Sequence, residues 1–533
     1  MPTQIEILEE ALRAAIRGAI AAGTLSGTAP DLIKLERPKD RDHGDYATSI
    51  ALQLAKPAGI NPREVAQIIA NQLSGVADIS KVEIAGPGFI NITLNRASQA
   101  ALVQTILTAK SGYGKGSALT GVKINLEFIS ANPTGPLHLG HTRWAAVGDA
   151  LGRVLTAAGA QVTREFYIND RGNQMDLFGQ SVEAVALGNA VPENGYQGEY
   201  IKDLAQEVVA QNSGIKELLG DERFIAFREA AYKLQLKDQQ RVLETFNTHF
   251  DVWFSERSLH DQGAVEHGME KLRAKGHVFD VDGAVWLRTS DYGDDKDRVM
   301  TKSDGSLTYF ASDTAYYINK RERGFDICIY MLGADHHGYI GRLKATAACA
   351  GDDPAYNVEV LIGQLVKIME GGEEVKLSKR AGTIITLEEL VEKVGVDAAR
   401  YTLIRYPVDT PMVMDIDVLK RNTNENPVYY VQYAHARIAA VLRNAQELGA
   451  SLNLSDFDPT QLVHDRENEL LGALAEFPRI VASAAEFREP HRIARYLEEL
   501  AGTYHGFYND CRVLPMGDEE LSALHTARLL LCT

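Results

Sequence analysis

Residues 123–168 restrict the possible folds more than any other segment of the chain. A short apolar run, KINLEFI, ends at residue 129, and the loop SANPTGPLHLGH follows it. A helical pattern then continues to Gly159, a residue type that commonly ends helices, and VTREFYI predicts a second strand. A strand–helix–strand unit of this kind is right-handed and belongs to a parallel sheet. We therefore expect an α/β domain that binds ligands at the carboxyl ends of its strands.

The chain has 533 residues, enough for about three or four domains. Helical and strand patterns mix in residues 1–110, which predicts a small α+β domain, and a Gly/Ser-rich linker follows it. Residues 118–410 are expected to form a Rossmann-type domain with a parallel sheet, interrupted at about 170–300 by an acidic helical insertion. From residue 411 to residue 533 the pattern predicts an all-α helix bundle.

Composition and charge exclude several classes of protein. The net charge of −17 argues against a non-specific nucleic-acid binder, so any contact with RNA should use local patches and stacked rings. No apolar run approaches about 18 residues, which predicts no membrane span. The first ten residues include three glutamates and no basic residue, unlike a secretory signal. Four scattered cysteines suit a reducing compartment, and we expect the cytoplasm.

The HLGH segment, residues 138–141, lies between a strand and a helix, where the helix N-terminus favours phosphate. His138 and His141 are three residues apart, so both imidazoles can donate to one anion. Gly140 lets a flat base approach the backbone, and Pro136 helps to stiffen the loop. Without this position, an HxxH pair would more often be a solvated turn. A zinc site is disfavoured, because no Cys or acidic third ligand lies nearby in the sequence.

The KLSKR segment, residues 376–380, follows a Gly-Gly pair after a predicted strand. Lys376, Ser378 and Lys379 are donors of the kind that phosphoryl and adenylyl transfer requires, because they stabilise charge that develops on phosphates. An exposed basic hairpin would explain this segment taken alone. Its position at a strand end in the same α/β domain as HLGH favours a shared phosphate site.

These segments give the chain a close resemblance to the class I aminoacyl-tRNA synthetases, and to the arginyl-tRNA synthetases in particular. HLGH is similar to the family's HIGH motif, KLSKR to its KMSKS motif, and GADHHG to its ribose-binding glycine–x–aspartate element. EFISANPTGPLHLGHTRWA, FYINDRGNQ and NPVYYVQYAHARI are typical of the arginyl enzymes. The resemblance covers essentially the whole chain.

The resemblance implies a ligase that activates L-arginine with ATP and transfers it to the 3′ end of tRNA(Arg), with activation dependent on bound tRNA. It implies ATP and Mg²⁺ as cofactors, and we expect no metal held by the protein, no membrane partner and a monomer. The catalytic residues would be His138, His141, Lys376 and Lys379. The ATP-binding residues would be Pro136, His138, Gly140, His141, Gly333, Asp335, Lys376, Ser378 and Lys379.

The resemblance also implies an arginine site made of Glu127, Asn132, Tyr309, Asp313 and His336. A guanidinium is a planar cation that binds carboxylates and flat partners. By resemblance, Glu127, Tyr309 and Asp313 hold the guanidinium, while Asn132 and His336 hold the ammonium and carboxylate groups. Without the resemblance, Glu127 would suit a surface carboxylate and Asp313 a helix N-cap.

Four tyrosines are expected to contact tRNA. The helix predicted within NPVYYVQYAHARI places Tyr430 and Tyr433 on nearly one face, which suits base stacking but also the rim of a helix-bundle core. By resemblance, the C-terminal helices bind the anticodon stem-loop, with Tyr430, Tyr433 and Tyr496 as contacts. The N-terminal domain would meet the outer corner of the tRNA, with Tyr46 in GDYA as a contact.

Other functions remain open on the sequence alone. A small-molecule nucleotidyltransferase of the same HxGH fold would need neither the N-terminal domain nor the C-terminal helices. A non-catalytic tRNA-binding paralogue would be expected to lose histidines or lysines from the two loops, and none is missing here. Glutamyl or glutaminyl specificity is opposed by the acidic residues of the expected pocket.

Overall fold

The computed structural model describes residues 4–38, 40, 43–95, 100–336, 338–375, 385–450 and 452–533. The chain divides into two compact units. Unit 1 comprises Met1–Lys115, Tyr430–Ile480 and Tyr496–Thr533, and unit 2 comprises Gly116–Tyr429 and Val481–Arg495. The predicted mixed α/β class is confirmed, because unit 2 contains a parallel five-stranded sheet and the C-terminal region is helical.

The N-terminal part of unit 1 packs helices on a small antiparallel sheet with the strand order β1-β3-β2. Its elements are α1 (Gln4–Ala21), β1 (Tyr46–Thr48), α2 (Ile50–Ala58), α3 (Pro62–Leu73), β2 (Ile79–Ala85) and β3 (Phe89–Leu94). α3 begins with the side chain of Asn61 accepting a hydrogen bond from the backbone of Arg63, and with Pro62 at its first position. Leu12, Ile69 and other apolar residues form one core.

The remainder of unit 1 is a helical bundle. Its helices are α5 (Leu102–Ala109), α17 (Pro427–Glu447), α18 (Asp465–Glu486), α19 (His491–Asp510) and α20 (Ala523–Cys532). Leu470, Phe507 and Leu530 are buried in its core. The end of α18 and the start of α19 belong to unit 2.

The central sheet of unit 2 has five parallel strands in the order β11-β10-β4-β5-β6. They are β4 (Lys123–Glu127), β5 (Gln161–Ile168), β6 (Val252–Ser255), β10 (Ile327–Gly333) and β11 (Val358–Gly363). Side chains of β10 alternate between two cores, with Ile329 packed toward one face of the sheet and Cys328 toward the other. Burial of both faces explains why these strands read as apolar runs in the sequence.

Helices and a small mixed sheet complete the part of unit 2 that surrounds the central sheet. The helices are α6 (Leu139–Ala157), α12 (Tyr309–Glu322), α13 (Tyr339–Cys349), α14 (Leu387–Val394), α15 (Val396–Ile404) and α16 (Ile416–Leu419). The small sheet has the order β13-β12-β14, from β12 (Val366–Glu370), β13 (Glu373–Glu374) and β14 (Met412–Asp415). α6 packs on one face of the central sheet, and α12 and α13 pack on the other.

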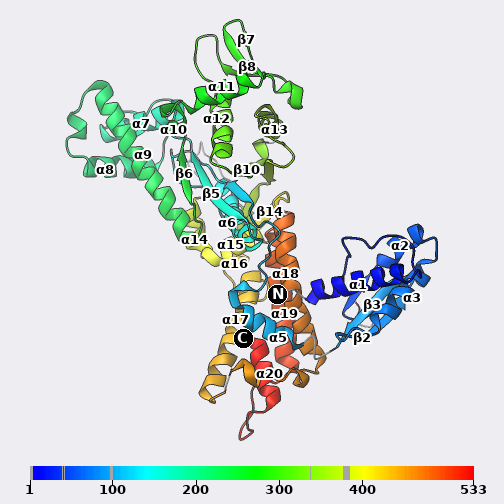
Figure 1. The fold of residues 1–533 in the computed structure, drawn as a ribbon. Helices are drawn as coiled ribbons and strands as arrows, with labels where there is room; N and C mark the ends of the chain where they lie inside the picture. Colours follow the sequence, from blue (N-terminus) through cyan, green and yellow to red (C-terminus); the bar gives the residue numbers. More distant parts are fainter. Residues whose placement is uncertain are drawn as a thin grey trace. The chain divides into compact units, whose positions relative to one another are not determined.

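The region from about residue 170 to residue 300 contains strands as well as helices. Its elements beside β6 are α7 (Asn173–Ala186), α8 (Glu199–Gln211), α9 (Gly220–Thr245), α10 (Glu256–Asp261), α11 (Ala264–Ala274), β7 (Val278–Val281), β8 (Ala284–Leu287) and β9 (Arg298–Thr301). α7, α8 and α9 pack together as a helical lobe (Figure 1). β6 joins the central sheet, and β7, β8 and β9 form an antiparallel one. Strands of four residues in polar surroundings are too short to predict from an alternating pattern.

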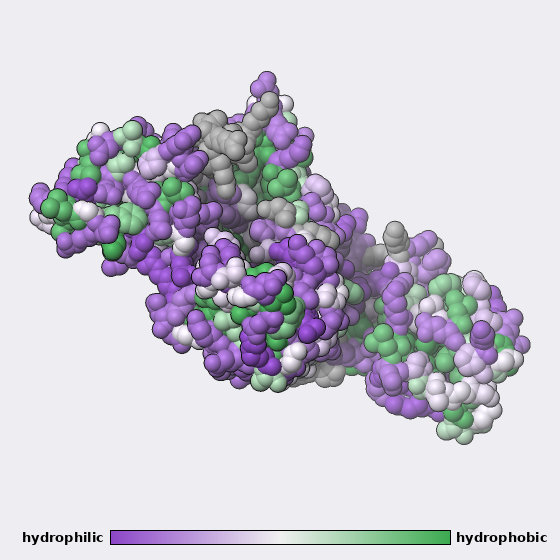
Figure 2. All heavy atoms as spheres, turned by 90° about the horizontal axis from the view of Figure 1, so that it is seen from above, coloured by the Kyte–Doolittle hydropathy of each residue, from purple (hydrophilic) through white to green (hydrophobic). Residues whose placement is uncertain are grey.

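Hydrophilic residues cover most of the surface that is visible in Figure 2, and the apolar residues there form scattered patches. Scattered apolar residues are normal on a folded protein. Within the described ranges, no helix combines the length and the apolar character that crossing a lipid bilayer requires.

Candidate active site

The loops after β4 and β10 lie at the same edge of the central sheet. β4 ends at Glu127 and leads through the HLGH loop into α6, while its neighbour β10 ends at Gly333. Because the two strands pair in parallel, with Glu127 opposite Tyr330, their carboxyl ends meet. This edge is where α/β sheets bind ligands.

The two histidines of HLGH stack at the start of α6, with ring centroids 4.0 Å apart. The Nδ1 atom of His138 accepts a hydrogen bond from the backbone N–H of Gly140 (3.1 Å), and the backbone N–H of His138 donates to Nδ1 of His141 (3.3 Å). With Nδ1 accepting, a neutral imidazole carries its proton on Nε2, which suits donation to a phosphate. A Cβ at Gly140 would lie 3.0 Å from the His138 ring, so a larger residue there would crowd that ring. Pro136 is half-buried in the loop before the pair.

Residues 385–387, which follow the KLSKR segment, are hydrogen-bonded to the HLGH loop. The backbone N–H of Leu139 donates to Ile385 (3.1 Å), that of Leu387 donates to Leu137 (2.8 Å), and His138 bridges Thr386. Thr386 then caps α14 in a capping box with Glu389, in the Thr-x-x-Glu pattern that commonly begins helices. The predicted residues Lys376, Ser378 and Lys379 lie outside the described residues, but the C-terminal flank of their segment meets the histidine pair.

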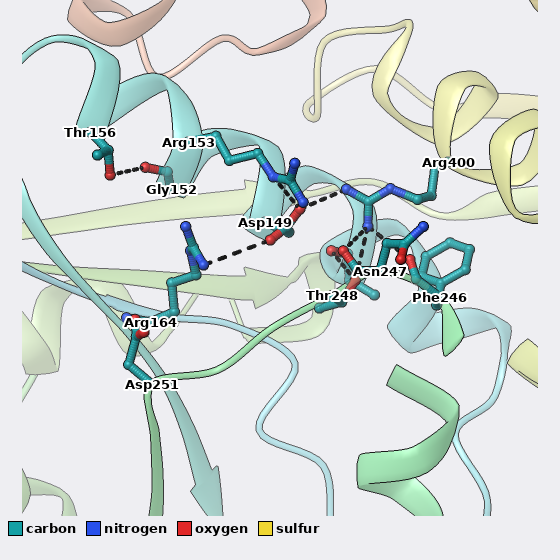
Figure 3. Close-up of polar contacts among 11 residues, drawn as sticks. Asp149, Gly152, Arg153, Thr156, Arg164, Phe246, Asn247, Thr248, Asp251 and Arg400 are labelled. Carbon is teal, nitrogen blue, oxygen red and sulfur yellow. Dashed lines mark hydrogen bonds and ion pairs between the residues drawn. The ribbon is translucent and has the colours of Figure 1, made fainter. Parts of the chain in front are cut away.

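A buried ion-pair cluster anchors the helix that carries the histidines (Figure 3). The carboxylate of Asp149, on α6, is fully buried and accepts hydrogen bonds from Arg153 (2.9 Å) and Arg400 (2.7 Å), with Arg164 at 4.0 Å. Arg400 lies on α15 and also donates to the carbonyl of Phe246 (2.9 Å). We call these four charged residues the Asp149 cluster. It joins α6 to α15 through Arg400 and places Arg164 of β5 beside the same carboxylate.

Asp313 lies in the second turn of α12, where its carboxyl is poorly solvated. Burial raises the pKa of Asp313 to about 7. A hydrogen bond from the hydroxyl of Tyr339 (3.2 Å) opposes that rise in pKa, the charge of Glu127 adds to it, and the charge of Arg342 opposes it. A bound cation would stabilise the ionised form of this carboxyl group.

The carboxyl group of Glu256 lies close enough to that of Asp313 for the two charges to interact, and Glu256 was not predicted from the sequence as a site residue. Glu256 is 5% exposed and begins α10, directly after β6. Burial raises the pKa of Glu256 to about 7, and the charges of Asp313 and Asp170 add to the effect, while Arg171 and a hydrogen bond from Tyr167 oppose it. The strand before Glu256, VWFS, is too short for an alternating pattern to have located Glu256 at the sheet edge.

Glu127 completes an acidic cluster, which we define as Glu127, Glu256 and Asp313. Its side chain is 11% exposed. It is paired with a cation of the chain itself: Nζ of Lys320 donates to Oε2 (2.6 Å), and the hydroxyl of Ser130 donates to Oε1 (3.0 Å). The structure therefore brings together two of the predicted guanidinium ligands, Glu127 and Asp313.

Asn132 is held by residues of the helical lobe. Its side-chain amide donates to Gln174 at the start of α7, and its carbonyl accepts a hydrogen bond from Gln239 of α9 (3.1 Å). Gln239 also donates to the carbonyl of Gly135 (2.8 Å). The lobe thus fixes the backbone of the HLGH loop, a role that the sequence alone did not indicate.

Tyr309 and His336 are exposed at the same edge. Tyr309 begins α12 with 69% of its surface exposed, and a Cβ at Gly172 would lie 3.7 Å from its hydroxyl. The ring of His336 lies 5.9 Å from that of Tyr339, edge to face.

The predicted ribose element begins where β10 ends. Gly333 pairs with Gly363 of β11 and is followed by a single 3₁₀ turn, Ala334–His336. The side chain of Asp335 lies outside what the structure describes. Among the described residues, no group of three or more His, Cys, Asp or Glu side chains is arranged to hold a metal ion.

Three family models match the chain in succession. They are the arginyl tRNA synthetase N terminal domain (residues 6–94), the catalytic domain of the class I tRNA synthetases (R) (residues 102–437) and the DALR anticodon binding domain (residues 431–533). The arginine–tRNA ligase of Paenarthrobacter aurescens (strain TC1) is 54% identical, over 99% of this chain and 95% of that protein. This chain belongs to the class I arginyl-tRNA synthetases.

Solved structures of similar proteins agree with this family assignment. A putative arginyl-tRNA synthetase from Campylobacter jejuni is 34% identical with a TM-score of 0.75, covering 82% of this chain and 95% of that one. The arginyl-tRNA synthetase of Thermus thermophilus has the same TM-score at 21% identity, covering 99% and 96%. The second match shows the shared fold.

Aromatic rings and a cation gather on the helical bundle of this synthetase. Tyr430 and Tyr433 of α17 lie beside His505 of α19, with ring centroids 5.1 and 5.7 Å from that of His505. The guanidinium of Arg437 lies over the rings of Tyr433 (4.4 Å) and Tyr508 (4.9 Å). We call these five residues the aromatic cluster. Tyr433 and Tyr508 are 37% and 39% exposed, so the cluster offers rings of the kind on which nucleic-acid bases stack.

The other two tyrosines predicted to contact tRNA are buried. Tyr46 is 1% exposed in the core of the N-terminal part, and burial raises its pKa to about 12. Tyr496 is 6% exposed, with its ring 5.3 Å from that of Phe477. Neither ring is presented for stacking in this arrangement, and their contact with tRNA stays a prediction.

Proposed function

We propose that this synthetase is an arginine–tRNA ligase, which activates L-arginine with ATP and transfers the arginyl group to the 3′ end of tRNA(Arg). The observation that carries the proposal is the acidic cluster at the sheet edge, next to the helix that begins at the histidine pair. Three buried or half-buried carboxyl groups suit a cationic side chain. The relative at 54% identity is named an arginine–tRNA ligase, which supports the same activity here.

The guanidinium of arginine is assigned to Asp313 and Glu256, with Tyr309 as a flat partner and Glu127 nearby. Both carboxyl groups have pKa values raised to about 7, so a permanent cation would favour their ionised forms. Lysine carries a point charge rather than a planar fork and would match two carboxylates less well. Asn132 and His336 are assigned to the ammonium and carboxylate groups of the amino acid.

In the first step, a carboxylate oxygen of arginine attacks the α-phosphorus of ATP, and the bond to pyrophosphate breaks. The products are arginyl-adenylate and pyrophosphate. No general base is needed, because the attacking carboxylate is already ionised near neutral pH. Catalysis then consists of positioning the reactants and stabilising charge on the phosphates.

The residues assigned to ATP act on its phosphates and ribose. His138 and His141 would donate to the phosphates from Nε2, and Lys376, Ser378 and Lys379 would reach them from the neighbouring segment. Gly140 and Pro136 would border the base, with Gly333 and Asp335 at the ribose. Magnesium would enter as the Mg–ATP complex, because Mg²⁺ prefers phosphate oxygens and water as ligands.

In the second step, a terminal ribose hydroxyl of tRNA attacks the carbonyl carbon of the adenylate. The new ester forms, the bond to phosphate breaks and AMP leaves. The aromatic cluster supplies the contact proposed for the anticodon stem-loop, since its region matches an anticodon-binding domain. We expect this enzyme to act as a monomer in the cytoplasm.

The two alternative functions are not favoured. A small-molecule nucleotidyltransferase would not require the domains that match at residues 6–94 and 431–533. A non-catalytic paralogue is disfavoured by the intact histidine pair and lysine segment and by high identity to named ligases over the whole chain.

The decisive test is ATP-dependent attachment of radiolabelled amino acids to bulk tRNA by the purified protein. We expect arginine to be attached, and lysine and glutamate to be left in solution. Attachment of either of these, or of none, would reject the proposal. Pyrophosphate exchange with and without tRNA(Arg) then tests whether activation depends on tRNA: equal rates would reject that dependence.

A further inference from the structure

Lys320 carries a fully buried ammonium group next to the acidic cluster. The residue is 0% exposed, and its Nζ atom lies 2.6 Å from Oε2 of Glu127. Nζ also lies 4.3 Å from the ring centroid of Tyr316 and 3.9 Å from that of Tyr330. Buried charges require paired or π-facing partners, and within the described part of the chain Glu127 accepts the hydrogen bond of this ammonium.

The second oxygen of Glu127 is also engaged. The hydroxyl of Ser130 donates to Oε1 (3.0 Å) and accepts a hydrogen bond from the backbone N–H of Tyr167 (3.2 Å). A carboxylate binds a guanidinium best when both oxygens face the planar fork. Each oxygen of Glu127 accepts one hydrogen bond from the chain, so Lys320 and Ser130 together fix the orientation of this carboxylate.

Glu127 instead borders a strained turn. Ile129 and Ser130 have φ values of +70° and +46°, and the backbone N–H of Ser130 donates to the carbonyl of Phe128 (3.0 Å). This is a γ-turn around a β-branched residue, a conformation that persists where neighbouring contacts hold it. The chain of contacts Lys320–Glu127–Ser130 holds it here, and Asn132 follows the turn.

We propose that Lys320 is a positioning residue for amino-acid binding: its buried ammonium fixes Glu127, and through Ser130 fixes the turn that places Asn132. The inference rests on the proposed function, since it concerns arginine binding at the acidic cluster. In this account Glu127 links Lys320 to Ser130, next to the Asp313 and Glu256 carboxyl groups to which the guanidinium is assigned.

The test replaces Lys320 by Met in the full chain, which keeps an apolar stem and removes the charge. ATP–pyrophosphate exchange is measured with tRNA present. We expect the KM for arginine to rise about tenfold or more, while the KM for ATP stays within about twofold of wild type. In a Glu127→Gln background the same change should add little, because Lys320 acts through that carboxylate.

Arg321 offers a matched control on the same helix. Its guanidinium donates to both oxygens of Asp352 (2.9 and 3.0 Å), a carboxylate that does not belong to the acidic cluster. Arg321→Met should lower the unfolding temperature and leave the KM for arginine unchanged. A change in arginine KM that matched that of Lys320→Met would show a general loss of stability and overturn the inference.

Three other results would also overturn it: an unchanged arginine KM in Lys320→Met, a lower one, or full additivity with Glu127→Gln. A lower KM would mean that Lys320 competes with arginine for Glu127. If Lys320→Met does not fold, two other variants replace it. Lys320→Gln retains a donor and should raise the arginine KM by a smaller factor, and Ser130→Ala should raise the arginine KM but not the ATP KM. Unchanged arginine KM values in both variants would reject the inference. Wild-type arginine attachment is measured alongside, so failure of the proposed function would be seen separately.

Discussion

At the scale of single residues, amino-acid recognition depends most on Asp313. Asp313→Asn keeps the shape of the side chain and removes its charge, so we expect the Kd for arginine to rise about 30-fold or more, as for the loss of one member of a desolvated charge pair. Calorimetry with the purified protein measures this. Asp352→Asn is the control, because Asp352 pairs with Arg321 rather than with the acidic cluster. Wild-type affinity in Asp313→Asn would reject the guanidinium assignment.

The same carboxyl groups predict how arginine binding depends on pH. The pKa values of Asp313 and Glu256 are raised to about 7, so near pH 6 both groups are largely neutral in the free protein. Because a guanidinium pairs with the ionised form, affinity should rise between about pH 6 and pH 8, by roughly tenfold for each proton that must leave. Calorimetry at the two pH values checks this, and affinity that is flat or falls would contradict it.

Folding stability should depend on pH in the opposite direction to arginine affinity. The folded-state pKa values lie above the usual values of 3.8 and 4.5, so folding favours the neutral forms. Stability from these two groups is full below about pH 4 and is lost as the pH rises toward about 7. Bound arginine should reverse part of this loss, because it favours the ionised forms.

At the scale of elements, the Asp149 cluster should stabilise the packing of α6 against α15. Asp149→Asn removes the carboxylate that pairs with three guanidinium groups, and the mostly buried Arg400 then loses the partner that lies 2.7 Å from it. We expect a loss of about 3 kcal/mol in the free energy of unfolding, measured with urea. Arg153→Met should cost less than about 1 kcal/mol, because the side chain of Arg153 is 58% exposed. Equal stabilities in the two variants would contradict this account.

Elements were predictable where local patterns decide them. The strand, loop and helix around HLGH depend on apolar runs close together in the chain, so sequence reasoning located them. β6 is four residues long within a polar region, and Glu256 was therefore not placed at the sheet edge. The burial of Lys320 could not be predicted from neighbouring residues, because it depends on a carboxylate 193 residues earlier in the chain.

At the scale of the whole molecule, a net charge of −17 must be reconciled with a polyanionic partner. A chain of this charge gains little from long-range attraction to RNA, so its contacts should be local. Unit 2 contains the acidic cluster and the histidine pair, and unit 1 contains the aromatic cluster. Amino-acid activation and tRNA binding should therefore respond to different substitutions.

Tyr433→Ala tests this separation. Stacking of one base on an aromatic ring contributes about 1–3 kcal/mol, so we expect the KM for tRNA(Arg) to rise about tenfold. The KM for arginine at saturating tRNA should stay unchanged, because Tyr433 lies in unit 1 and the acidic cluster in unit 2. The control is Tyr356→Ala, a tyrosine of unit 2 that is 51% exposed and outside the aromatic cluster. Because stacking depends weakly on sequence, non-cognate tRNA should lose affinity in Tyr433→Ala by a similar factor. An unchanged KM for tRNA would mean that the exposed rings serve the bundle itself, and the contact with the anticodon stem-loop would have to be sought elsewhere on the helices of unit 1.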